Sequence, residues 1–160
     1  MFTASDVFDM AIRIEENGER FYRDACERVR DSAIRQLLVW NADEELSHRE
    51  YFLSMKKTAR AGQPVNMQER IEGLLLQDAV ADHAFSLEEA DFSVMQNVVE
   101  LLETAIGFER DSIMFYEMVE SFVDDPEVIS HVKSITDEER KHIALLEERI
   151  MGLRQASVNR

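Results

Sequence analysis

Two Glu-x-x-His motifs in the sequence combine residue types that bind metal ions. Glu45 and His48 form the first motif, and Glu139 and His142 form the second. Residues three apart lie about 60° apart around an α-helix, so the carboxylate and the imidazole of each motif point the same way. A further glutamate precedes each motif by 30 residues, and these glutamates are Glu15 and Glu109.

The two motifs belong to an internal repeat, in which the chain aligns with itself at an offset of 94 residues without a gap. Phe21-Tyr22 aligns with Phe115-Tyr116, and Asp43-Glu44-Glu45 aligns with Asp137-Glu138-Glu139. A chance offset over the 66 aligned positions would produce only about four identities. Many matched residues are charged or polar and stand in the middle of apolar stripes, so a role in core packing does not explain them.

We interpret the repeated polar residues as the ligands of two metal ions. They are Glu15, Glu45, His48, Glu109, Glu139 and His142. A buried carboxylate without a partner is costly, so four carboxylates with two imidazoles at one level require cations. Carboxylate and imidazole ligands together suit iron, manganese or zinc. The alternative is a buried polar network without metal, which is harder to satisfy than a metal site.

Charge balance favours two iron ions as the cofactor. Four carboxylates balance two divalent ions, and two ferric ions joined by an oxo group carry the same total charge. Such a site changes redox state with little change in buried charge. Zinc would gain nothing from this balance, because it does not change its oxidation state. Bundles with one glutamate on each of two helices and Glu-x-x-His on each of the other two hold di-iron and di-manganese sites. Manganese or zinc is the alternative for the protein as isolated.

Long amphipathic helices are expected to position these residues. Apolar residues recur with helical period over 4–30, 33–60, 92–122 and 127–152. Asp31-Ser32 separates the first two helices and Asp124-Asp125-Pro126 separates the last two; Asp followed by Pro is typical of a helix start. The low content of glycine and proline, five and two residues, disfavours a β-sandwich or a β-barrel.

The predicted fold class is all-α, a ferritin-like four-helix bundle of two helix hairpins joined by a long crossover. We expect a single domain over residues 1–160. Hairpin one covers about 4–60, the crossover about 61–91 with a short helix near 67–82, and hairpin two about 92–152. In each hairpin the glutamate and the Glu-x-x-His motif are equally far from the turn, so they meet about 22 Å from it.

Charge and apolar patterning limit the partners of the chain. It has 33 acidic and 18 basic residues, and this net charge of −15 is repelled by nucleic acids and by anionic membranes. Its apolar runs are a few residues long, and its N-terminus lacks the apolar segment of a signal peptide. The single cysteine, Cys26, excludes an internal disulfide and a CxxC metal site. We therefore expect a cytoplasmic protein.

The repeated motifs resemble the rubrerythrin-like branch of the ferritin-like di-iron carboxylate superfamily. One half contains A-x-x-x-E-x-x-G-x-x-F-Y from Ala11 to Tyr22, the other contains A-x-x-x-E-x-x-S-x-x-F-Y from Ala105 to Tyr116, and D-E-E-x-x-H follows each. The resemblance covers roughly residues 5–58 and 93–151. It implies a di-iron site that reacts with oxygen or hydrogen peroxide, and it implies a homodimer.

The chain departs from the pattern of that family in two ways. Full rubrerythrins add a rubredoxin domain with four cysteines, whereas this chain has only Cys26, so the resemblance does not identify an electron donor. Rubrerythrin peroxidases carry an extra glutamate one turn after the first glutamate of the third helix, where this chain has Ser112. The resemblance therefore implies a symmetric site with six ligands.

Two functions fit these observations. The first is a di-iron oxidoreductase that oxidises Fe(II) with oxygen or hydrogen peroxide, of the ferroxidase or peroxide-scavenging type. The second is a non-enzymatic iron carrier, sensor or storage protein. A purely structural helical bundle is a third hypothesis. None of them requires a catalytic residue beyond the metal ligands.

Residues near the ligands have less specific interpretations. Tyr22 and Tyr116 lie on the ligand face, where they either donate hydrogen bonds to the ligands or pack as aromatic rings. The acidic residues Asp43, Glu44, Asp137 and Glu138 are expected to be solvated, with support of the ligands or admission of iron as the alternative. His83 and His131 are expected on the surface, while Cys26 and Trp40 are expected to pack.

Overall fold

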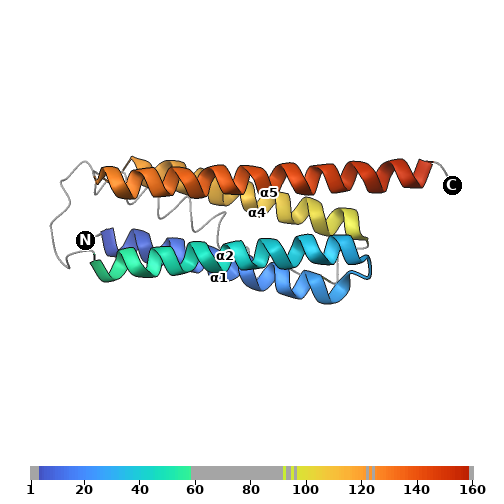
Figure 1. Cartoon of the computed structure of the whole chain (residues 1–160), viewed down its shortest axis with the longest axis horizontal. Helices are drawn as coiled ribbons and strands as arrows, with labels where there is room; N and C mark the ends of the chain where they lie inside the picture. Colours follow the sequence, from blue (N-terminus) through green and yellow to red (C-terminus); the bar gives the residue numbers. More distant parts are fainter. Residues whose placement is uncertain are drawn as a thin grey trace.

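The computed structural model describes residues 4–58, 92, 95, 97–121, 123 and 125–158. Within them lie four long helices, α1 (Ala4–Arg28), α2 (Ser32–Thr58), α4 (Val98–Glu120) and α5 (Pro126–Val158). Helices α1 and α2 form one antiparallel hairpin, and α4 and α5 form a second hairpin beside it (Figure 1). The predicted all-α four-helix bundle is confirmed, while the helix expected near 67–82 lies outside the described residues.

The turn of each hairpin ends at the predicted helix-start residue. The Asp31 Oδ1 atom accepts hydrogen bonds from the backbone N–H of Ala33 at 2.9 Å and of Ile34 at 3.0 Å. Asp125 Oδ1 likewise accepts from the backbone N–H of Glu127 at 2.9 Å. Such side-chain acceptors satisfy N–H groups that the first helical turn leaves free. Both second helices therefore begin where the equal spacing of the ligand residues requires.

Two helix boundaries differ from the prediction. Helix α4 begins at Val98 rather than near residue 92, because Asn97 has an extended backbone with φ −155° and ψ 169° and accepts a hydrogen bond from the Glu100 N–H. Helix α5 continues to Val158 rather than ending near 152. It passes through Gly152 because one glycine costs a helix only about 1 kcal/mol. As a result, α5 extends past the turn between α1 and α2 (Figure 1).

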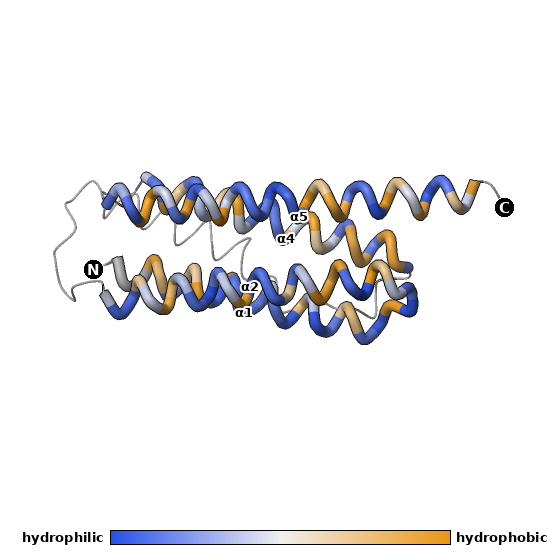
Figure 2. Tube along the Cα trace, viewed as in Figure 1, coloured by the Kyte–Doolittle hydropathy of each residue, from blue (hydrophilic) through white to orange (hydrophobic). Residues whose placement is uncertain are grey.

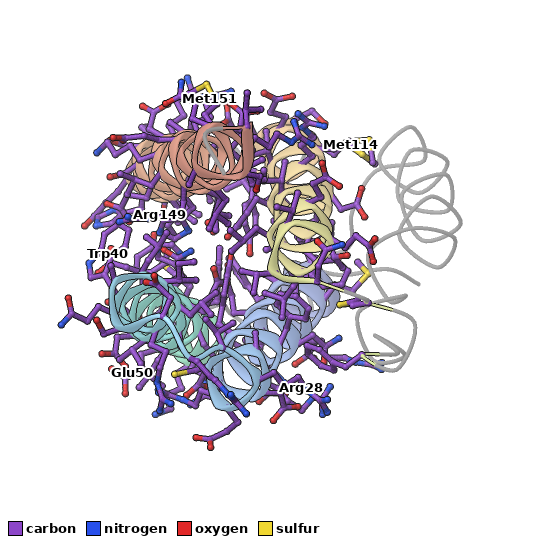
Figure 3. The ribbon with its side chains drawn as sticks, turned by 90° about the vertical axis from the view of Figure 1, so that its right-hand side faces the viewer. Arg28, Trp40, Glu50, Met114, Arg149 and Met151 are labelled. Carbon is purple, nitrogen blue, oxygen red and sulfur yellow. The ribbon has the colours of Figure 1, made fainter. Side chains whose placement is uncertain are left out.

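The apolar core has two parts with a polar layer between them. Along α1, one buried apolar cluster ends at Ile14 and the other begins at Phe21. Along α2, the stretch between Ala42 and Phe52 separates the same two clusters. Hydrophobic and hydrophilic residues alternate along every helix (Figure 2), and side chains from all four helices meet inside the bundle (Figure 3). Apolar packing therefore closes both ends of the polar layer.

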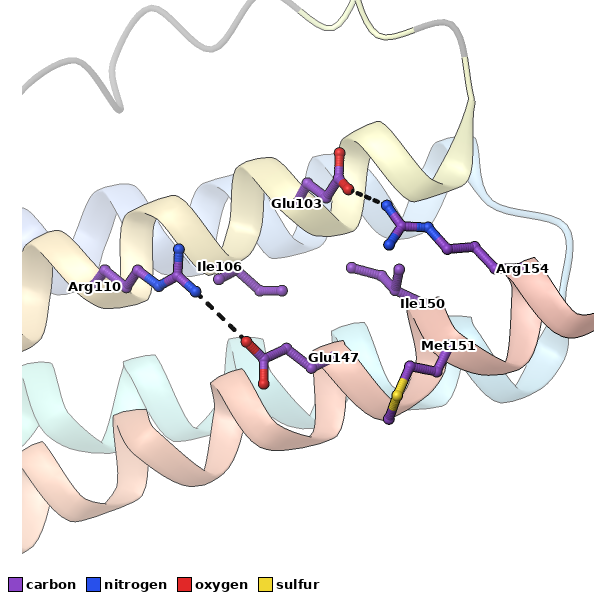
Figure 4. Close-up of a pocket in the computed structure, with 7 residues that line it drawn as sticks. All are labelled: Glu103, Ile106, Arg110, Glu147, Ile150, Met151 and Arg154. Atoms are coloured by element: carbon purple, nitrogen blue, oxygen red, sulfur yellow. Dashed lines mark hydrogen bonds and ion pairs between the residues drawn. The ribbon is translucent and has the colours of Figure 1, made fainter.

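Charged residues on the outer face join α4 to α5. Arg154 pairs with Glu103 at 2.6 Å, and Arg110 pairs with Glu147 at 3.5 Å. The two pairs flank a surface hollow of about 530 Å³ between the helices (Figure 4). None of the predicted ligand residues lines this hollow. None of the described helices has the length and apolar character that a membrane span requires.

Candidate metal centre

The bundle interior brings all six predicted ligands together. Each is at most 4% exposed, and the set comprises Glu15 on α1, Glu45 and His48 on α2, Glu109 on α4, and Glu139 and His142 on α5. The two imidazole rings stack at an interplanar angle of 21°, with their centroids 6.2 Å apart. Each hairpin contributes one glutamate and one Glu-x-x-His motif, so neither hairpin contains the whole cluster.

The cluster consists of two overlapping groups that could each hold a cation. The groups are Glu15, Glu45, His48 and Glu139, and Glu45, Glu109, Glu139 and His142. In each group the candidate ligand atoms all lie within 4.8 Å of one another. Glu45 and Glu139 belong to both groups, one from each hairpin. The arrangement therefore offers two adjacent cation positions with two carboxylates between them.

The Glu139 carboxylate lies between the two imidazoles. Its Oε1 atom is 3.1 Å from Nδ1 of His48, and its Oε2 atom is 2.8 Å from Nδ1 of His142. Nδ1 of His142 also lies 3.3 Å from Oε1 of Glu109. Nδ1 of His48 lies 3.5 Å from Oε2 of Glu15. In both rings, Nδ1 is therefore the nitrogen that faces the carboxylates.

Many buried atoms of the cluster have no hydrogen-bond partner. They are Oε2 of Glu15, Oε1 of Glu45, both carboxylate oxygens of Glu139, Nδ1 of His48 and both ring nitrogens of His142. Buried polar groups in proteins are nearly always paired, so unpaired atoms that face one another need another partner. Metal ions satisfy such oxygen and nitrogen atoms, and this donor set suits iron, manganese and zinc. The residues present therefore fit two metal ions.

The two shared carboxylates differ in how strongly they bind a proton. Burial raises the pKa of Glu45 well above its usual value, and the carboxylates of Glu139 and Glu109 raise it further. Burial would also raise the pKa of Glu139, but the imidazoles of His142 and His48, which lie close to its two oxygens, lower it to about 2. Without metal, Glu139 is therefore the ionised carboxylate between the rings, whereas Glu45 keeps its proton to higher pH.

Glu109 and the two imidazoles have raised pKa values, so they bind protons more strongly than usual. Burial raises the pKa of Glu109 to about 8, an effect that the charge on Glu139 strengthens and His142 weakens. Burial would lower the pKa of both imidazoles, but the surrounding carboxylates outweigh it. They raise the pKa of His48 to about 12 and that of His142 to about 10. The metal-free cluster therefore holds extra protons that metal binding must displace.

Two tyrosines bind glutamates across the gap between the hairpins. The Tyr22 hydroxyl on α1 donates a hydrogen bond to Oε1 of Glu109 on α4, and the Tyr116 hydroxyl on α4 donates one to Oε1 of Glu15 on α1. Burial, followed by the nearby carboxylate charges, raises the pKa of both tyrosines, so both hydroxyls stay protonated. Each glutamate thus has one oxygen held by a tyrosine, which limits its rotation.

Gly18 allows the Glu45 side chain to approach α1 closely. A Cβ atom at position 18 would lie only 2.6 Å from Oε2 of Glu45 and 3.0 Å from its Cδ. The aligned residue on α4 is Ser112, which is also buried. Any residue larger than glycine at position 18 would therefore displace the Glu45 carboxylate. The unequal pair of glycine and serine was visible in the repeat, but its effect on Glu45 required the structure.

Two residues beside the candidate ligands contact the imidazole rings. Glu138 was expected to be solvated, but its Oε2 atom lies 2.8 Å from Nε2 of His48. Trp40 packs, as expected, and its ring meets that of His142 in a T-shaped contact with centroids 5.2 Å apart. Each contact joins one hairpin to the other. An alignment of the repeat cannot show such contacts, because it pairs positions and not touching side chains.

The remaining residues singled out by the sequence lie away from the cluster. His131 is exposed, as expected, and its ring stacks on Tyr51 with centroids 4.6 Å apart. Cys26 is buried and free, in agreement with a packing role. Asp43 and Asp137 are exposed, as expected. His83 lies outside the part of the chain that the structure describes.

Comparisons with known proteins agree with this geometry. The protein-family model described as Rubrerythrin matches residues 6–150. A solved structure from Thermotoga maritima, described as a ferritin-like diiron-carboxylate protein, is 27% identical with a TM-score of 0.68, and the match covers 94% of this chain and 95% of that one. A hypothetical protein from Pyrococcus furiosus shares the fold at 20% identity and a TM-score of 0.71, covering 96% and 92%. A search of curated proteins found no match.

Proposed function

The chain belongs to the rubrerythrin family, and on this premise we propose that it binds two iron ions in the bundle core and oxidises Fe(II) with oxygen or hydrogen peroxide. The observation that carries this proposal is the pair of overlapping ligand groups that share Glu45 and Glu139. A site for one metal ion would not need a second imidazole and two shared carboxylates. The buried, unpaired oxygen and nitrogen atoms of the same residues support the proposal.

The ligands divide between the two proposed ions according to their distances. Glu15 and His48 would hold one ion and Glu109 and His142 the other, while Glu45 and Glu139 belong to both ligand groups. When bound, two neighbouring Fe(II) ions would together supply the two electrons that one molecule of oxygen or peroxide accepts. Hard carboxylate oxygens favour the higher charge of iron, which makes its oxidation easier.

The surrounding residues hold the ligands in place and exclude water. The hydroxyls of Tyr22 and Tyr116 each fix one oxygen of a glutamate on the opposite hairpin. The two apolar clusters close the polar layer from both ends, with Phe52 and Tyr116 stacked at a centroid distance of 5.4 Å on one side. In such a desolvated site, the charges of the carboxylates act strongly on a bound cation.

Iron analysis and iron oxidation together test this function. Protein purified from its source without added metal should contain two iron ions per chain. Metal-free protein mixed with Fe(II) in air should produce a ferric species that absorbs in the near ultraviolet, faster than iron alone. Glu45→Ala and Glu139→Ala should each slow this reaction, because each removes a carboxylate shared by both groups.

Matched controls are available on the same two helices. Glu50 on α2 and Glu148 on α5 are exposed, so Glu50→Ala and Glu148→Ala should oxidise iron at the rate of the unaltered chain. If these control variants slowed iron oxidation as much as the ligand variants do, the proposed site would be refuted. Binding of two iron ions with no acceleration of oxidation would instead identify an iron carrier, sensor or storage protein.

A further inference from the structure

The outer nitrogens of the two imidazoles have different surroundings. Nε2 of His48 lies 2.8 Å from Oε2 of Glu138, whereas Nε2 of His142 has no hydrogen-bond partner. In the repeat, Glu44 is the counterpart of Glu138. Glu44 nevertheless groups with Glu138 around His48, with candidate ligand atoms within 4.8 Å of one another. Both outer glutamates therefore lie on the His48 side of the centre.

Trp40 provides the corresponding environment on the other side. Its ring packs against His142 with a centroid distance of 5.2 Å and an interplanar angle of 82°. The aligned residue in the second hairpin is Ser134, which has no ring to place against His48. The outer nitrogen of His48 thus meets a carboxylate, whereas the ring of His142 packs against an indole and its outer nitrogen has no hydrogen-bond partner. The internal repeat does not extend to these outer contacts.

A carboxylate on the far nitrogen of a metal-binding imidazole strengthens that imidazole as a ligand. It fixes the tautomer in which the near nitrogen is free to coordinate, orients the ring and raises its basicity. Only His48 has this support among the described residues, and the negative charges of Glu138 and Glu44 add a further attraction for cations. His142 must coordinate without an acceptor on its outer nitrogen.

From this asymmetry we propose that the two cation positions fill in a set order, first at Glu15 and His48 and then at Glu109 and His142. Glu138 is the positioning residue that sets the order, because it acts on the cation through His48. The inference rests on the proposed two-cation site and adds to it an order that the repeat does not predict. It concerns binding alone, so it can be tested without turnover.

Cobalt(II) binding to variants with one imidazole separates the two positions. His142→Ala keeps the His48 position intact, and His48→Ala keeps the His142 position intact. Anaerobic calorimetry with Co(II) should give an affinity about 10- to 100-fold higher for His142→Ala than for His48→Ala. Equal affinities, or tighter binding by His48→Ala, would overturn the proposed order. Circular dichroism of each variant checks that the four helices are retained.

Glu138→Gln added to each background tests the role of Glu138. It should weaken Co(II) binding about 10- to 100-fold beside His48 and less than about twofold in the His48→Ala background. Asp137→Asn is the charge control, because Asp137 is the exposed neighbour of Glu138 and pairs with Arg140 at 2.7 Å. An equal loss with Asp137→Asn, or an equal loss in both backgrounds, would overturn the assignment.

The unaltered chain distinguishes failure of the order from failure of the site. If it binds two Co(II) ions, the two-cation site stands whatever the variants show about the order. If it binds fewer than two, the two-cation site itself is refuted. Should a single-imidazole variant fail to fold, Glu138→Gln in the otherwise unaltered chain should weaken the tighter of two binding steps and leave the other unchanged. Weakening of the second step alone would overturn the inference.

Discussion

The two hairpins supply the same types of candidate ligand but surround them differently. Each contributes a glutamate, a Glu-x-x-His motif and a tyrosine that reaches a glutamate of the other hairpin. Around this shared set, Gly18 is aligned with Ser112, and Trp40 is aligned with Ser134. Only one imidazole has a carboxylate on its outer nitrogen. The comparison teaches that the repeat specifies the candidate ligands, while the unmatched residues decide how the two halves differ.

The two shared glutamates should differ most in their effect on stability. Glu139 is the ionised partner of two buried imidazoles, so Glu139→Gln should destabilise the metal-free protein by about 3–5 kcal/mol. Oε1 of Glu45 lies 3.7 Å from Nδ1 of His142, and burial disfavours the ionised form of Glu45. Glu45→Gln should therefore lower the free energy of unfolding by less than about 1 kcal/mol. Urea unfolding at neutral pH measures both. If both variants lowered the free energy of unfolding equally, the two shared glutamates would be equivalent.

The stability of the metal-free protein should depend on pH in a direction set by its shifted groups. The pKa of Glu109 is raised from 4.5 to about 8. Its contribution to the free energy of unfolding is therefore complete below pH 4.5 and is lost as pH rises towards 8. Both imidazoles also have raised pKa values, so their contributions fade above pH 6.5, towards 10 and 12. The lowered pKa of Glu139 acts oppositely, and its contribution is lost as pH falls from 4.5 towards 2.

Thermal melting across this range tests the balance of these contributions. The melting temperature of the metal-free protein should be highest near about pH 5 and should fall on both sides. Glu109→Gln should reduce the fall between pH 4.5 and 8, which would assign that loss to the second hairpin. Loading the protein with metal should flatten the profile. A melting temperature that stays constant over this range would contradict the assigned shifts.

The crossed tyrosines should show where the two hairpins are equivalent. Tyr22→Phe and Tyr116→Phe each remove the hydroxyl donor from one buried glutamate. Each should therefore destabilise the metal-loaded protein by a similar amount, about 1–3 kcal/mol. Chemical unfolding at saturating metal provides the measurement. A difference between the two variants above about 1 kcal/mol would extend the asymmetry of the hairpins to their tyrosines.

Gly18 and Ser112 should differ in metal affinity more than in stability. Gly18→Ala should change the metal-free stability by no more than about 1 kcal/mol, because alanine favours the helix and the Glu45 side chain can move. That movement should weaken Co(II) binding by roughly tenfold, equivalent to about 1.4 kcal/mol. Ser112→Ala should leave Co(II) affinity within about twofold. Unchanged Co(II) affinity in Gly18→Ala would show that the position of Glu45 does not matter for binding.

The parts of the molecule that depend on local backbone geometry could be predicted from the sequence. The helical period, the caps at Asp31 and Asp125, and the equal spacing of glutamates from the turns led to the bundle and to the clustering of the six residues. The contacts that residues outside this set of six make between the hairpins, such as Glu138 with His48, could not be predicted. They depend on how one hairpin is rotated against the other, which a repeat within the sequence does not reveal. Metal binding by the cluster stays a prediction.

The polar layer between the hairpins has a consequence for how long the protein survives. The two helices within each hairpin pack more closely together than helices of different hairpins do, so we expect local opening to occur along the seam between the hairpins. The polar layer bridges this seam, and cations bound to the candidate ligands would connect the two hairpins across it. A chain that has lost its cations should open more often along the seam, and proteases cleave the open form of a protein. Metal occupancy would in this way set how long each copy survives proteolysis.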